Sequence, residues 1–128
     1  MKLLLDTHLL IWQIGQPKKL SAAARTYLDN PSNELLFSAA SIWEVAIKYG
    51  RGRDDFRIDP RLMRRGLLDH GYIELPITSA HAAAVERLPP LHKDPFDRIL
   101  VAQSAEEEII LLTADPLIAQ YRGLVRGV

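Results

Sequence analysis

Short apolar runs alternate along this chain with longer segments whose apolar residues recur every three or four positions. The short runs predict strands at 2–6, 34–38, 72–77 and 109–113, and a last edge strand at 123–128. The longer segments predict helices at 7–15, 20–30, 41–50, 60–71, 78–88, 94–108 and 114–121. Strands that alternate with helices indicate an α/β fold with a central parallel sheet, and 128 residues fit a single domain over 1–128.

Capping residues mark most of the predicted helix starts. The candidate N-caps are Thr7, Ser21, Ser41, Thr78, Asp94 and Asp115. Ser41 and Glu44 have the spacing of a capping box, in which each side chain bonds the backbone of the other. Pro60 and Pro95 stand at first helical positions, where the missing backbone donor is harmless.

Four carboxylates fall near the carboxyl ends of the predicted strands, which is where parallel α/β sheets bind ligands. They are Asp6, Glu44, Asp97 and Asp115. Helix capping or the helix dipole is an alternative explanation for Glu44, Asp97, Asp115 and the nearby Asp94. Asp6 has the weakest alternative, because Thr7 can cap the same helix and a carboxylate at a buried sheet edge loses hydration.

Several carboxylates at one sheet edge repel one another, and a divalent cation removes that repulsion. The chain has no cysteine and no paired histidine motif, so the candidate ligands are oxygen atoms. Oxygen ligands favour Mg²⁺ or Mn²⁺ over zinc. Such acidic sites are common in phosphoryl-transfer and nuclease chemistry, and the residues alone indicate a candidate acidic metal site.

Overall charge does not point to a nucleic-acid or membrane partner. Sixteen Lys and Arg residues balance sixteen Asp and Glu residues, while 48% of the chain is apolar, as in ordinary globular proteins. The absence of cysteine excludes disulfides, zinc–thiolate sites and a thiol nucleophile. Asp6 and His8 interrupt the first apolar run, so a signal peptide is not expected. We expect a soluble, cytoplasmic protein without a membrane span.

Local clusters of basic residues have two interpretations. Lys48, Arg51 and Arg53, together with Arg98 beside Asp97, form either a solvated surface or a path for an RNA backbone. The two tryptophans, Trp12 and Trp43, are expected in the core or at a subunit interface rather than as base-stacking platforms. The four single histidines share no ligand spacing.

Three segments carry a family resemblance: "LLLDTHLLIW", "SAASIWEVAIKYGRG" and the stretch from "LPITSAHAAAVERL" through "HKDPFDRILVAQ" to "LLTADP". They resemble a PIN domain, and more narrowly the VapC-type toxin ribonucleases of bacterial toxin–antitoxin pairs. The resemblance implies a three-layer α/β/α sandwich and cleavage of single-stranded RNA. It also implies a quartet that binds Mg²⁺ or Mn²⁺, formed by Asp6, Glu44, Asp97 and Asp115.

The same resemblance extends to accessory residues and partners. Asp94 matches an extra acid of the "DPFD" subgroup, while the hydroxyls of Thr7, Ser38 and Thr113 either orient ligands or serve as caps and turns. A homodimer and a cognate antitoxin whose C-terminal segment occupies the cleft are expected. Two alternatives are a non-catalytic PIN-like module that binds RNA or protein, and a haloacid-dehalogenase-like phosphatase with Asp6 as nucleophile. The second lacks its usual further aspartate, since His8 stands there.

Overall fold

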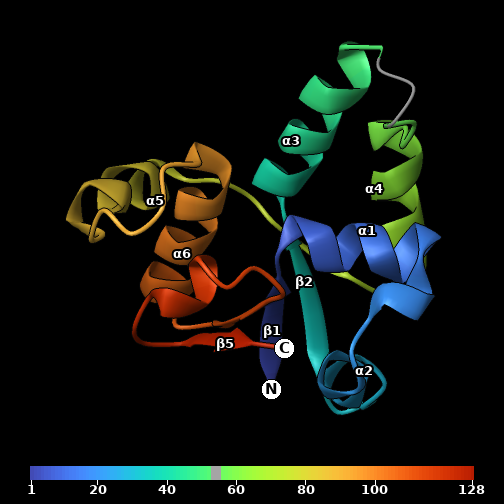
Figure 1. The fold of residues 1–128 in the computed structure, drawn as a ribbon, viewed down its shortest axis with the longest axis horizontal. Helices are drawn as coiled ribbons and strands as arrows, with labels where there is room; N and C mark the ends of the chain where they lie inside the picture. Colours follow the sequence, from blue (N-terminus) through green and yellow to red (C-terminus); the bar gives the residue numbers. More distant parts are fainter. Residues whose placement is uncertain (53–55) are drawn as a thin grey trace.

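The computed structural model describes residues 1–52 and 56–128. In this part of the chain the strands form one five-stranded sheet in the order β3-β2-β1-β4-β5, and every neighbouring pair is parallel. The strands are β1 (Lys2–Leu5), β2 (Glu34–Ser38), β3 (Ile73–Leu75), β4 (Ile110–Thr113) and β5 (Val125–Gly127). The predicted central parallel sheet is confirmed, including its last edge strand (Figure 1).

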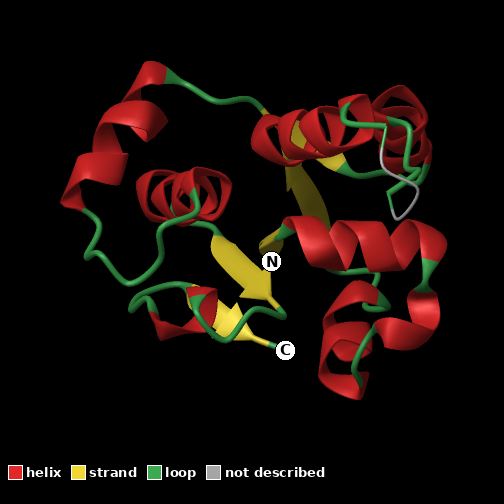
Figure 2. Ribbon diagram, turned by 45° about the horizontal axis from the view of Figure 1, so that its top comes forward, coloured by secondary structure: helices red, strands yellow, loops and turns green. Residues whose placement is uncertain are grey.

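Helices surround this sheet (Figure 2). The α-helices are α1 (Thr7–Gly15), α2 (Ala22–Leu28), α3 (Ala39–Gly50), α4 (Pro60–Asp69), α5 (Ser79–Ala84) and α6 (Pro95–Glu107). Short 3₁₀ turns are η1 (Pro17–Lys19), η2 (Val85–Arg87) and η3 (Ile118–Gln120). Among the described residues, no helix is long and apolar enough to cross a membrane.

The continuous apolar runs of the central strands are explained by a core on each face of the sheet. Successive side chains of a strand point to opposite faces, so Leu3 and Leu5 pack on one side with α1, α2 and α4. Leu4 lies on the other side, where Leu100 of α6 joins the same buried cluster. Figure 1 shows α5 and α6 on one side of the strands and α1 and α4 on the other, which confirms the three-layer α/β/α sandwich.

Several predicted helix starts are confirmed by their hydrogen bonds. The Ser21 hydroxyl accepts a hydrogen bond from the Ala24 backbone N–H at 3.0 Å, and Thr78 and Asp94 likewise cap α5 and α6. Pro60 opens α4, where Asp59 is the cap. These short polar side chains satisfy backbone donors that the first turn leaves unpaired.

The predicted capping box of Ser41 and Glu44 is wrong. Helix α3 begins at Ala39, directly after β2, and Ser38 is its N-cap because its hydroxyl accepts from the Ala40 N–H at 3.0 Å. Ser41 and Glu44 therefore lie inside the helix and are buried. Glu44 loses its capping explanation, so its burial needs another.

Three further details of the prediction are corrected. Asp6, not Thr7, is the N-cap of α1. The helix predicted at 78–88 ends as an α-helix at Ala84 and continues as η2, which Pro89 and Pro90 follow. The helix predicted at 114–121 is only a turn followed by η3, because the chain must return within a few residues to form β5.

The strand order reverses once, and this reversal defines the switch point at which the candidate site lies. From β1 the chain moves outward to β2 and β3, and then returns to β4 on the other side of β1. The carboxyl ends of β1 and β4 flank this switch point, where parallel α/β sheets bind ligands. Asp6 follows β1 directly and Asp115 follows β4 by two residues.

Candidate acidic metal site

Asp6 is held by hydrogen bonds to both carboxylate oxygens. Its Oδ1 accepts from the Leu9 N–H at 2.9 Å, while Oδ2 accepts from the Thr113 hydroxyl at 2.6 Å and the Ala114 N–H at 3.1 Å. The residue is only 1% exposed. Burial raises the pKa of Asp6, and these hydrogen bonds partly oppose that shift.

Thr113 joins the ends of β1 and β4. While its hydroxyl donates to Asp6, the same oxygen accepts from the Asp115 N–H at 3.0 Å. Asp115 in turn caps the next turn, since its Oδ1 accepts from the Leu117 N–H at 2.8 Å. The capping role predicted for Asp115 is present, and one hydroxyl links the Asp6 carboxylate to the Asp115 backbone.

Glu44 presents a buried oxygen that lacks a donor. The residue is 6% exposed, and its Oε2 lies 3.1 Å from the Lys48 Nζ. The other oxygen, Oε1, is buried without a hydrogen-bond partner among the described residues. Leaving a buried carboxylate oxygen unpaired is unfavourable by a few kcal/mol, so this oxygen fits a cation that would complete the site.

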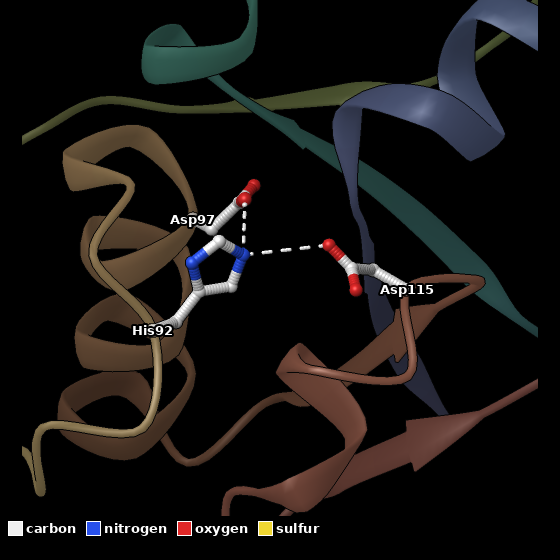
Figure 3. Close-up of side chains that lie close together, drawn as sticks. All are labelled: His92, Asp97 and Asp115. Atoms are coloured by element: carbon white, nitrogen blue, oxygen red, sulfur yellow. Dashed lines mark hydrogen bonds and ion pairs between the residues drawn. The ribbon is translucent and has the colours of Figure 1, made fainter.

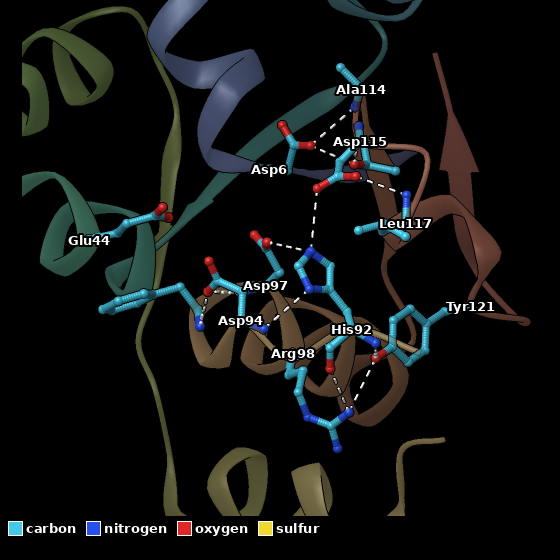
Figure 4. A network of polar contacts seen from close by, with 12 residues as sticks. Asp6, Glu44, His92, Asp94, Asp97, Arg98, Ala114, Asp115, Leu117 and Tyr121 are labelled. Atoms are coloured by element: carbon cyan, nitrogen blue, oxygen red, sulfur yellow. Dashed lines mark hydrogen bonds and ion pairs between the residues drawn. The ribbon is translucent and has the colours of Figure 1, made fainter. Parts of the chain in front are cut away.

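The pKa of Asp97 is shifted by the acids around it. Burial, followed by the charges of Asp94 and Glu44, raises the pKa of Asp97 to about 7; Asp115 adds to this rise and His92 opposes it. Figure 4 shows Asp6, Glu44, Asp97 and Asp115 gathered around one region although they come from separate segments. Among the described residues, Asp97 and Asp115 lie close enough to share an ion together with His92, whereas Glu44 acts on Asp97 through its charge and Asp6 is linked to Asp115 through Thr113.

Asp94 is used mainly as a helix cap. Its Oδ1 accepts from the Phe96 N–H at 2.8 Å and from the Asp97 N–H at 3.3 Å. This confirms the predicted N-cap and explains why Pro95 can follow it, because Pro95 has no N–H to satisfy. The charge of Asp94 still acts on Asp97 next to it.

His92 is the site residue that the sequence did not identify. Its Nε2 lies 3.0 Å from Oδ2 of Asp97 and 3.4 Å from Oδ2 of Asp115 (Figure 3). Together these three side chains form a group that could hold a metal ion. No pattern of paired histidines marks it; the only sequence signal is its position two residues before the Asp94 cap.

The accessory hydroxyls are all buried, and two of them position helices. The Thr7 hydroxyl donates to Ser41 Oγ at 2.9 Å and so links α1 to α3. Ser38 caps α3. Of the three candidates, only Thr113 directly contacts one of the acids.

The predicted basic residues have different surroundings: Lys48 lines a cleft, whereas Arg98 contacts backbone carbonyls. Lys48 lines a cleft of about 600 Å³ and pairs with Glu44. Arg51 is exposed after α3, and Arg53 lies outside the described residues. Arg98 Nη1 and Nη2 donate to backbone carbonyls of the segment before α6, at 3.1–3.5 Å, so its guanidinium supports that segment.

The two tryptophans differ. Trp12 is partly buried against the core, whereas Trp43 is 59% exposed and meets the Phe96 ring edge-on at a centroid distance of 5.0 Å. A core position is therefore wrong for Trp43. Its exposure next to Glu44 leaves two predictions untested, a subunit interface, which the sequence favours, and a base-stacking platform.

An all-parallel α/β/α domain with acidic residues at its switch point defines the class of fold, and sequence comparison gives the family. The PIN domain family model matches residues 3–124. A curated relative, ribonuclease VapC22 of Mycobacterium tuberculosis, is 30% identical over 120 residues, which cover 93% of this chain and 91% of the relative. The chain belongs to the PIN-domain family, and this relative groups it with the VapC-type members.

Solved structures show the same fold at lower sequence identity. A VapBC2 structure from Rickettsia felis, bound to a promoter DNA fragment, has a TM-score of 0.74 at 11% identity and covers 99% of this chain and 98% of its own. DNA-bound VapBC from Salmonella typhimurium has a TM-score of 0.66 at 14% identity, with coverage of 99% and 98%. The family assignment excludes the haloacid-dehalogenase-like alternative.

Proposed function

We propose that this protein is a metal-dependent endoribonuclease that hydrolyses phosphodiester bonds of single-stranded RNA. Family membership and a relative that carries the name ribonuclease support the nuclease class. The observation that carries metal dependence is the buried Oε1 of Glu44, which has no partner in the described part of the chain and lies beside Asp97, whose pKa is raised by burial and by neighbouring carboxylates. A buried acidic cluster of this kind is stabilised by a divalent cation.

Asp6, Glu44, Asp97 and Asp115 would hold Mg²⁺ or Mn²⁺. Bound there, the cation would lower the pKa of an attacking water and offset charge on the scissile phosphate. Asp94 is the weaker candidate because its Oδ1 already caps α6. The protein itself orients the Asp6 carboxylate through the Thr113 hydroxyl and the Ala114 N–H, and burial keeps bulk water from it.

We further propose that the RNA backbone enters through the cleft beside Glu44. This cleft is lined by His8, Ile11, Gly15, Gln16, Lys19, Lys48, Phe56, Arg57 and Ile58. Lys48 connects it to the acids, because its Nζ contacts Glu44 and also lies 5.8 Å from the centre of the Phe56 ring. Basic side chains beside an aromatic ring suit single-stranded RNA, because cations contact the phosphates and an aromatic ring stacks on exposed bases. Arg51, exposed directly after α3, would extend this path.

The toxin role and the partners are also proposals. The solved relatives are described as VapBC complexes, so we propose a cognate antitoxin that covers this cleft, a cytoplasmic location and a homodimer. Trp43, exposed and stacked edge-on against Phe96, is the residue we expect at a protein interface.

The test is cleavage of a single-stranded RNA oligonucleotide by purified wild type and Asp6→Asn. We expect cleavage with Mg²⁺ or Mn²⁺, none with EDTA, and a loss of more than about 100-fold in Asp6→Asn. Asp69→Asn, an exposed acid at the end of α4, is the matched control and should cleave normally. Sequencing RNA ends after induction in cells would identify the target.

The non-catalytic alternative makes opposite predictions. A module that only binds RNA or protein would show no Mg²⁺ or Mn²⁺ binding by calorimetry in antitoxin-free protein. Full metal-dependent cleavage by Asp6→Asn would contradict the proposed mechanism, even if the protein is a nuclease.

A further inference from the structure

His92 lies in the segment between η2 and α6 and reaches two of the proposed metal ligands. Its side chain is 13% exposed, and its Nε2 is 3.0 Å from Asp97 and 3.4 Å from Asp115 (Figure 3). Two roles fit these distances. Hydrogen-bonded atoms are about 3 Å apart, and so are neighbouring ligand atoms on an octahedral ion with bonds of about 2.1 Å. The distances alone do not separate a metal ligand from a hydrogen-bond donor.

The other ring nitrogen separates the two roles. The backbone N–H of Asp94 donates to Nδ1 of His92 at 3.2 Å (Figure 4). A nitrogen that accepts a hydrogen bond carries no proton, so the proton of the neutral ring is on Nε2. A ring that bound a metal through Nε2 would carry its proton on Nδ1 instead. That proton would then point at the Asp94 N–H, donor against donor.

The backbone around His92 keeps the ring in this arrangement. The His92 N–H donates to the Tyr121 hydroxyl oxygen at 3.1 Å, and the His92 carbonyl accepts from Arg98 Nη1 at 3.3 Å. Arg98 Nη1 also lies 3.2 Å from the Tyr121 hydroxyl, which closes the network. The Asp94 N–H is fixed as well, because the Asp94 side chain caps α6.

We infer that His92 is a positioning residue that donates its Nε2–H to Asp97 and Asp115 and stays outside the ligand set of the proposed metal. This inference rests on the proposed function. The bridging N–H holds together two carboxylates that would otherwise repel, one from α6 and one from the turn after β4. Each carboxylate oxygen keeps further lone pairs for a cation. The geometry also gives the Asp94 backbone a role separate from its side chain: it fixes the His92 tautomer.

The direct test is ¹⁵N NMR of the histidine rings, recorded on metal-free protein and on protein saturated with Mg²⁺. The tautomer is read from which ring nitrogen carries the proton. We expect His92 to keep its proton on Nε2 in both samples. A shift of the proton to Nδ1 when Mg²⁺ binds would overturn the inference and make His92 a ligand. If the protein binds no Mg²⁺ at all, the proposed function fails instead, so the two failures are distinguishable.

Substitutions add a second readout, which is Mn²⁺ affinity measured by calorimetry. Loss of a group that orients metal ligands typically weakens binding about 10–100-fold, and we expect this for His92→Ala. His92→Gln retains an N–H donor and should recover most of the affinity. The matched control is His70→Gln, because His70 is exposed and its Nδ1 contacts the Gly66 carbonyl. Wild-type affinity in a folded His92→Ala would contradict the role, and the NMR test holds if that variant fails to fold.

Discussion

The carboxylates on the two sides of the acidic site differ in the hydrogen-bond donors that the protein supplies to them. On the strand side, formed by Asp6, Thr113 and Asp115, the protein supplies hydrogen-bond donors to the carboxylates. On the helix side, formed by Glu44 and Asp97, Glu44 Oε1 is buried without a partner in the described structure, and the pKa of Asp97 is raised to about 7. Both helix-side acids have one contact, to Lys48 and to His92, but a buried carboxylate oxygen of Glu44 lacks a donor in the described structure.

This difference indicates how such a site can fold before it binds metal. Carboxylates that accept backbone and hydroxyl hydrogen bonds can remain charged when buried. The strand side is therefore positioned by folding itself. Burial raises the pKa of Asp6 as well, but on the helix side neighbouring carboxylate charges add to burial and raise the pKa of Asp97, so most of the stabilisation from a bound cation should appear there. Changes on the two sides should consequently have different signatures.

The largest effect is expected for Glu44→Gln, which neutralises the helix side. Mn²⁺ affinity in calorimetry should fall about 100-fold, because a charged ligand becomes a neutral one. The free energy of unfolding of the metal-free protein should change by less than about 1 kcal/mol, because losing the Lys48 ion pair and relieving the repulsion on Asp97 act in opposite directions.

Glu74→Gln is the matched control for this prediction. Glu74 also pairs with a cation, Arg64 at 3.2 Å, but belongs to β3 rather than to the acidic site. It should bind Mn²⁺ as the wild type does. If Glu44→Gln retained wild-type affinity, the cation would not bind at the helix side, and the comparison would be wrong.

The second effect tests the strand side through Thr113→Val. Removing the hydroxyl leaves Asp6 Oδ2 with one donor fewer and the Asp115 N–H without its acceptor, both in a buried setting. We expect the metal-free protein to lose about 2 kcal/mol of unfolding free energy. Mn²⁺ affinity should fall about 10-fold, because Asp6 is less well oriented. Chemical denaturation and calorimetry measure the two quantities.

Two further variants are controls for Thr113→Val. Thr113→Ser keeps the hydroxyl and should restore most of both losses. Thr26→Val removes an exposed hydroxyl that bonds only the Ala22 carbonyl within α2, and should change stability by less than about 0.5 kcal/mol. A Thr113→Val protein as stable as the Thr26→Val protein would show that the hydroxyl does not hold the strand side together.

The sequence predicted the strand side better than the helix side. The apolar strands and the acids that follow two of them are local signals, so the positions of Asp6 after β1 and Asp115 after β4 were predicted correctly. The local prediction for Glu44 was wrong, because Ser38 and Ser41 are equally good N-caps and α3 begins directly after β2 without an intervening loop.

His92 shows a different limit of local patterns. Its partners Asp97 and Asp115 are brought to it by α6 and by the turn after β4, so the contact exists only in the tertiary structure. Similarly, Arg98 beside Asp97 suggested a phosphate contact, but its guanidinium is turned to carbonyl oxygens of the preceding segment. Short sequence spacing does not define the direction of a long side chain.

The third prediction is that Asp97→Asn stabilises the metal-free protein at high pH. The folded-state pKa of Asp97, about 7, is above its ordinary value of 3.8. The folded protein therefore binds this proton more tightly, and its stability falls as pH rises from about 4 to about 7. Asn removes that loss, so we expect a gain of about 1–2 kcal/mol at pH 8 and little change near pH 4.

Thermal or chemical unfolding at pH 8 and pH 4 measures this gain. Asp69→Asn, at an exposed position, should show no comparable dependence on pH. Saturating Mg²⁺ should reverse the order and make the wild type more stable than Asp97→Asn. Equal stability of both metal-free proteins at pH 8 would mean that the helix side carries no electrostatic strain.

The smallest effect concerns Lys48, which joins the helix side to the proposed RNA cleft. Lys48→Gln, made in the inactive Asp6→Asn background so that RNA stays intact, should weaken RNA affinity about 2–5-fold. The slope of log affinity against log salt should fall by about one, since one phosphate contact is lost. Lys18→Gln in η1 removes an exposed lysine outside the cleft and should leave the slope unchanged. An unchanged slope for Lys48→Gln would assign Lys48 to Glu44 alone, as a partner of the helix side rather than a contact for RNA.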